Sequence, residues 1–402
     1  MRPGIRLIVS LGMVSLLADV TYEGARSVAG PFLASLGAGA VVIGIISGFG
    51  ELVGYALRLA SGYLADRTRR YWPIALVGYF VNLLSVPCLA LAGSWPVAGT
   101  LLILERTGKG VRAPARDAIL SYAARSVGSG WGFGLHEALD QVGAVLGPLV
   151  VAGILYLSGG FRSAFAWLLV PALAALSVLL LARARFPEPE RLEEKEERHA
   201  ARAAEGGAPA PAGSEAHAAG GGVSRRSFRL LLISMALLAA GTIDFPLIAF
   251  HFQQQAVFSV GWIPVIYAIA MAVDGIGAPF LGKVFDRVGL AVLFVGPVGF
   301  AASAPLMLLS GPAAAVVGVA LWGLAIGTEQ SVARAAVAEL VPMARRGAGF
   351  GLFHAVIGVS WFVGSALMGW LYAHSVGGAV LASVGFQLAA AIALAGAAAA
   401  SR

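Results

Sequence analysis

Charged side chains inside long apolar stretches are the residues of this chain that could do chemistry. Of the 402 residues, 58% are hydrophobic and only 12% are charged. An ionised side chain at bilayer depth costs about 2.5–3.5 kcal/mol even on the lenient insertion scale, so these charges cannot face lipid. We expect them to line a polar interior in which the function resides. They are Asp19, Glu23, Glu51, Arg58, Glu105, Arg106, Lys109, Glu137, Asp140, Asp244, Asp274 and Glu329.

The first apolar stretch offers a proton-coupling site. Asp19 and Glu23 are one helical turn apart, and Arg26 follows along the same face. One carboxylate paired with an arginine and one left free is the arrangement that a proton carrier needs. The other candidates for proton coupling are Glu105, Arg106, Glu137 and Asp140. A static ion-pair network that holds the first half of the chain together is the alternative, and both roles are compatible.

A second set of residues is expected to line a substrate cavity. Its members are Glu51, Arg58, Lys109, His136, Asp244, Asp274, Glu329 and Trp361. In the second half of the chain the acidic members outnumber the basic ones, which suits a cationic or polar substrate. Arg112 and Arg116 share a helix face with Arg106 and Lys109. We expect both to lie near the helix end, where they snorkel or pair with Asp117.

The composition requires membrane-spanning elements to position these side chains. The mean hydropathy of +0.83 excludes an ordinary soluble domain, and several apolar runs exceed the roughly 18 residues that mark a spanning helix. One cysteine, Cys88, excludes an internal disulfide framework and a multi-thiolate metal site. The net charge of +7 comes from arginines between apolar segments, which favours topology signals over nucleic-acid binding. We expect no cofactor, and a lipid bilayer as the surroundings.

Turns and charge clusters divide the chain into twelve expected helices. We predict them over 5–30, 40–65, 72–93, 97–123, 131–157, 163–185, 228–255, 261–283, 289–310, 313–340, 347–372 and 376–400. The fold class is therefore an all-α membrane protein with two six-helix bundles, over residues 1–185 and 228–402. The charged, then Ala/Gly/Pro-rich segment 186–227 is predicted to be a flexible cytoplasmic linker. Arginines concentrate in alternate connections, which predicts that both termini are cytoplasmic and that the membrane is a bacterial-type inner (plasma) membrane.

The two halves carry similar short motifs. GYLADR at 62–67 matches GKVFDR at 282–287, ARDA at 115–118 matches ARAA at 333–336, and GFGL occurs at 132–135 and 349–352. Two parallel six-helix repeats around a central cavity are typical of a secondary transporter.

The segment from Gly62 to Arg70 resembles the loop between the second and third helices of the major facilitator superfamily, and Gly282–Gly289 is a weaker copy. The resemblance implies a conformational gate formed by Gly62, Asp66, Arg67, Arg70, Asp286 and Arg287. Leu102-x3-Arg106-x2-Lys109-Gly110 is similar to the fourth-helix motif of that superfamily, with Lys109 where many members have Gln. In proton-coupled members this arginine is implicated in proton transfer.

A glycine pattern on the fifth expected helix resembles that of the twelve-helix drug/proton antiporters. Gly134-x8-Gly143-x3-Gly147-Pro148 matches its first part, whereas Val151 and Ala152 stand where the closing glycine pair would be. The resemblance adds Gly143, Gly147 and Pro148 to the gate residues and favours export by antiport. Ordinary close packing of helices is the alternative.

We therefore expect a monomeric secondary transporter that exports a small organic molecule in exchange for protons by alternating access. A divalent transition-metal exporter using Asp19, Glu23, Asp244, Glu329, His136 or His354 is the first alternative, since oxygen and imidazole ligands suit such ions. A proton-coupled or uncoupled importer is the second, and a membrane sensor or scaffold is disfavoured. The pattern His136-Glu137-x2-Asp140 lacks the second histidine of a zinc peptidase, and we do not expect an enzyme.

Overall fold

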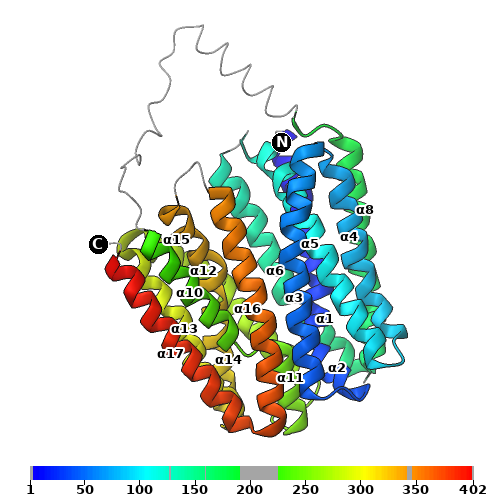
Figure 1. The fold of residues 1–402 in the computed structure, drawn as a ribbon. Coiled ribbons are helices and arrows are strands. Elements are labelled where there is room, and N and C mark those ends of the chain that lie inside the picture. Colours follow the sequence, from blue (N-terminus) through cyan, green and yellow to red (C-terminus); the bar gives the residue numbers. More distant parts are fainter. Residues whose placement is uncertain (1–2, 126–127, 159, 191–224, 342–345, 401–402) are drawn as a thin grey trace.

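The structure is a computed structural model that describes residues 3–125, 128–158, 160–190, 225–341 and 346–400 (Figure 1). Over these ranges the chain is helical, with turns between the helices and no β-strand. Among these described residues, ten helices or pairs of consecutive helices are long and apolar enough to cross a membrane. The chain is therefore an all-α, multi-pass membrane protein, as the hydropathy predicts.

The helices before residue 190 form the first bundle. They are α1 (Pro3–Arg26), α2 (Ala29–Ser35), α3 (Ala40–Thr68), α4 (Tyr71–Cys88), the 3₁₀ turn η1 (Leu89–Leu91), α5 (Trp95–Arg125), α6 (Ser129–Ser158), α7 (Phe161–Trp167) and α8 (Leu169–Arg185).

The helices after residue 225 form the second bundle. They are α10 (Arg225–Gly241), α11 (Phe245–Gln254), α12 (Ile263–Val288), the 3₁₀ helix η2 (Gly289–Phe294), α13 (Val295–Leu308), α14 (Pro312–Gly327), the π-helical turn η3 (Thr328–Val332), α15 (Ala333–Leu340), α16 (Arg346–His374) and α17 (Val376–Ala400). Most of the expected linker, 191–224, lies outside the described residues, and the domain boundaries stay a prediction.

Each of the twelve expected spans corresponds to one helix or to consecutive helices. Two of the helices that match expected spans, α5 and α14, are not among the ten apolar spans. Helix α5 carries six charged residues between positions 105 and 117, too many for an apolar window, and Pro312–Gly327 is a shorter apolar helix.

The first and seventh spans are broken, which the sequence analysis did not predict. The first consists of α1 and α2, with a break at residues 27–28 and an end at Ser35 instead of residue 30. The seventh consists of α10 and α11, with a break before Phe245. Pro31 and Pro246 lie in the first turns after these breaks, and each removes a backbone N–H that a continuous helix would use. The Asp244 side chain then caps α11 by accepting from the Phe245 amide at 2.9 Å.

The helix pairs at which the two bundles meet include α2 with α11, α3 with α11, α3 with α16, and α6 with α12. In Figure 1, α2 and α11 lie together at the end of the molecule away from the N-terminus. Glycines allow the backbones to touch there, since a Cβ added at Gly30 would overlap the Pro246 carbonyl and one added at Gly44 would overlap the Ser365 carbonyl. The bundles are thus packed tightly at the α2–α11 end.

Candidate functional site

The two helix breaks face each other and are joined by an ion pair. Arg26, the last residue of α1, donates from Nη2 to Asp244 Oδ1 at 3.1 Å. The other carboxylate oxygen of Asp244 accepts from the Ser47 hydroxyl of α3. The Asp244 side chain is only 3% exposed, so this contact between the bundles is buried.

A second buried contact joins the bundles one helical turn away. The Tyr267 hydroxyl of α12 donates to Glu23 Oε2 of α1 at 2.6 Å. The other oxygen, Oε1, lies 3.6 Å from Lys109 Nζ of α5. That ammonium also lies 4.0 Å from the centre of the Tyr22 ring, a cation–π contact. Glu23 therefore links α1, α5 and α12.

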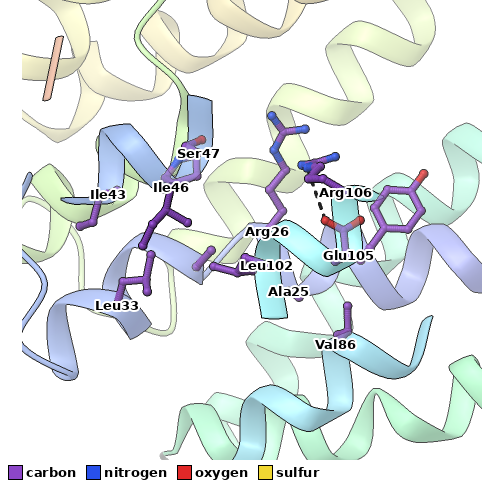
Figure 2. A pocket seen from close by; sticks show the side chains of 13 residues that line it. Ala25, Arg26, Leu33, Ile43, Ile46, Ser47, Val86, Leu102, Glu105 and Arg106 are labelled. Carbon is purple, nitrogen blue, oxygen red and sulfur yellow. Dashed lines mark ion pairs between the residues drawn. The ribbon is translucent and has the colours of Figure 1, made fainter. Parts of the chain in front are cut away.

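The remaining ion pairs of the site lie within the first bundle. Glu51 Oε1 is 3.5 Å from Arg26 Nη2 and 3.4 Å from Arg106 Nε. Arg106 Nε is also 3.4 Å from Glu105 Oε2 (Figure 2), and Asn82 Nδ2 donates to Glu105 Oε1 at 2.8 Å. These ion pairs form a network within the first bundle, and the two contacts between bundles are attached to it.

We call this assembly the central network. It comprises Glu23, Arg26, Glu51, Glu105, Arg106, Lys109 and Asp244. It holds four carboxylates and three cationic groups.

The other proton-coupling candidates lie along the seam between α1 and α6. The Asp19 side chain is buried and Asp140 is half-buried, and the Oδ1 atoms of both have no hydrogen-bond partner within the described part of the chain. His136, expected in the substrate cavity, lies on this seam and forms a 3.0 Å hydrogen bond with Ser15. Glu137 is exposed and accepts from Gln141 at 3.4 Å.

The other cavity candidates take no part in the ion pairs of the central network. Asp274 of α12 and Glu329 of η3 are 6% and 5% exposed, and the described residues provide no ion-pair partner for either. Trp361 of α16 is buried. The Arg58 guanidinium lies 5.6 Å from the centre of the Tyr55 ring.

The loop part of the expected gate is exposed. Asp66, Arg67 and Arg70 lie at the end of α3, which terminates where Arg69 adopts a left-handed φ of 53°. Arg67 Nη1 lies 3.4 Å from the Tyr63 hydroxyl, whereas no hydrogen bond or ion pair of the Asp66 side chain occurs among the described residues. In the second copy Arg287 is exposed, and the side chain of Asp286 lies outside the described part of the structure.

The expected gate residues within helices lie where neighbouring helices pack closely. Gly62 approaches the Pro114 side chain, with 3.5 Å between that side chain and an added Cβ. Gly143 and Gly147 bring the backbone of α6 against that of α1, and Pro148 is buried beside them.

Arg112 does not lie where the sequence analysis placed it. It is 1% exposed, with its guanidinium 4.4 Å from the Tyr79 ring centre and 5.6 Å from that of Tyr22. The snorkelling prediction is wrong because aromatic faces in the bundle receive this cation. Arg116 does pair with Asp117, at 2.8 Å.

Sequence reasoning did not predict the contacts that Ser47 and Tyr267 make between the bundles. A serine and a tyrosine in apolar helices carry no signal of their own. Their roles follow from contacts 197 and 244 residues away along the chain.

A small pocket of about 40 Å³ adjoins the central network in the first bundle (Figure 2). One part of the pocket is lined by Arg26, Glu105 and Arg106, and the rest mainly by apolar side chains such as Leu33 and Ile46. This volume is room for about three water molecules. Within the described residues no three His, Cys, Asp or Glu side chains converge as metal ligands would.

Comparison with known proteins identifies the family. Residues 11–331 match the model of the Major Facilitator Superfamily. An uncharacterized protein of Mycobacterium tuberculosis is 40% identical over 386 residues, which cover 96% of this chain and 91% of that protein.

Solved transporter structures share the fold. A mutant of the nucleoside transporter NupG superposes with a TM-score of 0.76 at 15% identity, covering 97% of this chain and 99% of that one. The peptide transporter POT in complex with sulfate gives a TM-score of 0.74 at 17% identity, covering 98% and 94%. The family match, together with the shared fold, indicates a membrane transporter. The chain belongs to the Major Facilitator Superfamily.

Proposed function

We propose that this protein exports a small organic solute in exchange for protons, by alternating access between its two bundles. The observation that carries the proposal is the pair of buried contacts between bundles, Arg26 with Asp244 and Glu23 with Tyr267. Both contacts lie at helix breaks or within one turn of them, where discontinuous helices of transporters commonly form their sites.

These contacts link proton binding to movement of the bundles. When the bundles separate on this side, Arg26 must leave Asp244 and Tyr267 must leave Glu23. Breaking a buried ion pair strands a charge and is strongly unfavourable. A proton on Asp244 removes one charge of the Arg26 pair, and a proton on Glu23 makes its carboxyl group a weaker acceptor for the Tyr267 hydroxyl. Protonation therefore favours the separated conformation, and the coupling is a difference in proton affinity between two conformations.

The direction of transport rests on the glycine pattern of α6. The pattern resembles that of drug/proton antiporters, and Gly143 and Gly147 hold α6 directly against α1, the helix that carries Asp19 and Glu23. We further propose a monomer in an inner (plasma) membrane with both termini in the cytoplasm. In this arrangement segment 186–227 links the bundles at 1–185 and 228–402.

The metal-export alternative requires several liganding side chains at one point. The described residues contain no such group, which favours an organic solute. An importer would use the same contacts between bundles, and only the direction of flux separates it from an exporter.

A thermal-stability screen of the purified protein with organic cations, organic anions, Ni²⁺, Co²⁺, Fe²⁺ and Mn²⁺ would identify a ligand, because a compound that binds the folded state stabilises it. Flux of the most stabilising compound is then measured in proteoliposomes with and without a pH gradient. We expect Asp19→Asn and Glu23→Gln to abolish the dependence of flux on the gradient while leaving the protein folded. Glu188→Gln, which neutralises an exposed carboxylate after α8, serves as the control.

Two outcomes would contradict the proposal in different ways. Wild-type flux that ignores the pH gradient would refute proton coupling. Wild-type flux that follows the gradient, with both variants behaving like wild type, would refute the assignment to Asp19 and Glu23.

A further inference from the structure

We propose that Trp322 of α14 and Ser383 of α17 are positioning residues. They hold the break between α10 and α11 in the form that presents Asp244 and Tyr267 to the first bundle. The inference rests on the proposed function, in which the contacts of these two residues control the separation of the bundles.

The break between α10 and α11 frees backbone carbonyl groups inside the second bundle. The last four carbonyls of a helix have no partner within it, and a buried carbonyl without a donor is costly. Gly241 is the last residue of α10, and Ile243, which is 2% exposed, lies in the break. Both carbonyls therefore need donors from outside the helix.

Side chains from two distant helices supply these donors. The Ser383 hydroxyl donates to the Gly241 carbonyl at 2.6 Å, and the Trp322 indole N–H donates to the Ile243 carbonyl at 3.0 Å. Both side chains are buried, so the two bonds are shielded from water. The break is therefore held by α14 and α17 as well as by the helices on either side of it.

The bond to Ile243 fixes the direction of Asp244. The Ile243 carbonyl and the Asp244 N–H belong to one planar peptide unit, so a donor that holds the carbonyl also orients the backbone of Asp244. Asp244 Oδ1 accepts from the Phe245 amide at 2.9 Å and from Arg26 Nη2 at 3.1 Å. A rotation of this peptide unit would move the carboxylate relative to both donors.

The Trp322 ring also supports the second contact between the bundles. Its centre lies 5.9 Å from that of the Phe245 ring and 6.5 Å from that of the Tyr267 ring, and the Phe245 and Tyr267 rings are 4.2 Å apart. Aromatic rings packed at such distances stabilise each other. The Tyr267 hydroxyl donates to Glu23 of the first bundle. Trp322 thus acts on Asp244 through the backbone and on Tyr267 through ring packing.

Close backbone packing fixes the position of Trp322 itself. A Cβ added at Gly323, the next residue of α14, would overlap the Ala270 carbonyl of α12. Ala270 lies three residues after Tyr267 on that helix. The place of the Trp322 ring relative to Tyr267 is therefore set within the second bundle.

The test measures how often the bundles separate between α2 and α11 in the full-length protein in lipid nanodiscs. Spin labels are attached at Ser35 and Gln255, exposed residues at the ends of these helices, with Cys88 replaced by serine. The distribution of distances between the labels gives the ratio of separated to closed molecules.

Each positioning residue has a variant that removes its donor. Trp322→Phe keeps an aromatic ring but cannot donate to Ile243, and Ser383→Ala cannot donate to Gly241. We expect each variant to raise the ratio of separated to closed molecules by about 2- to 10-fold, which corresponds to the loss of one hydrogen bond.

Ser234→Ala is the matched control. Ser234 of α10 is fully buried and donates across the same helix pair, to the Ala390 carbonyl of α17 at 2.8 Å, but it lies in the continuous part of α10. Its loss should lower the unfolding temperature, as Ser383→Ala does, and leave the distance distribution unchanged. The distribution therefore separates positioning from stability, since both serine variants lose a buried bond between α10 and α17.

An unchanged distribution in either variant would overturn the role of that residue, and an equal shift in Ser234→Ala would overturn both roles. If Trp322→Phe does not fold, Ser383→Ala decides the proposal by the same criterion. These measurements use no transported solute and no pH gradient. Failure here is therefore distinguishable from failure of the proposed function, which the flux measurements decide.

Discussion

Removing the Tyr267 hydroxyl should release the two bundles from each other. In Tyr267→Phe the ring stays in place, and Glu23 keeps Lys109 at 3.6 Å but loses its 2.6 Å donor from the second bundle. A hydrogen bond to a charged group contributes about 1.5–3 kcal/mol. Because this bond exists only while the bundles touch at this point, its loss should shift the conformational equilibrium about 10- to 150-fold toward separation.

Distances between spin labels measure this shift. Ser35 and Gln255 are exposed at the ends of α2 and α11, which pack against each other. Labels at these positions, in a background in which the only cysteine, Cys88, is replaced by serine, report whether that end is closed. We expect wild type to give mainly the short distance and Tyr267→Phe to add a population at a longer one.

Tyr372→Phe is the control for this experiment. It removes a buried hydroxyl whose partner, His251, belongs to the same bundle. The expected result is lower thermal stability with an unchanged distance distribution. Equal distributions for wild type and Tyr267→Phe, or the same shift in Tyr372→Phe, would refute the argument that the Glu23 contact holds the bundles together.

Two further predictions concern the stability of the first bundle. Arg106→Ala leaves Glu51 without one of its cations and Glu105 without its ion pair, and should cost about 3–5 kcal/mol, seen as low expression or a strongly lowered unfolding temperature; normal expression and activity would show that the pairing does not matter. Gly143→Ala places a methyl group against the backbone of α1 and should cost about 1–3 kcal/mol, whereas Gly153→Ala on the same helix, with nothing within 4 Å, should be neutral in thermal unfolding. Equal unfolding temperatures for the two glycine variants would contradict the tight α1–α6 seam.

The hydrophobic pattern predicted the spans because a helix in lipid must be long and apolar wherever it stands in the chain. It did not predict the breaks before α2 and α11. Pro31 and Pro246 were visible, but proline is tolerated inside membrane helices when neighbours satisfy the freed backbone groups. Pro148 lies within an unbroken α6, so the residue type alone does not decide between a bend and a break.

Charged residues, too, were predicted only in part from the sequence. Arg112 has the spacing of its neighbours on α5, yet it lies against two tyrosines instead of at the helix end. Arg116, one turn further, pairs with Asp117 as spacing suggested, because its partner is adjacent in sequence. A partner that is adjacent in sequence can be predicted from the sequence, and a distant one cannot.

The sequence by itself determined that this is a helical membrane protein, where its spans lie, and that its interior must hold charges, since lipid tolerates neither exposed backbone nor unpaired ions. Only the tertiary structure decided which charges meet. Arg26 and Asp244 are separated by 218 residues, and Glu23 and Tyr267 by 244. Their contact depends on how the two bundles pack. That packing is set by many close backbone contacts, such as Gly30 against Pro246, which no short stretch of sequence predicts.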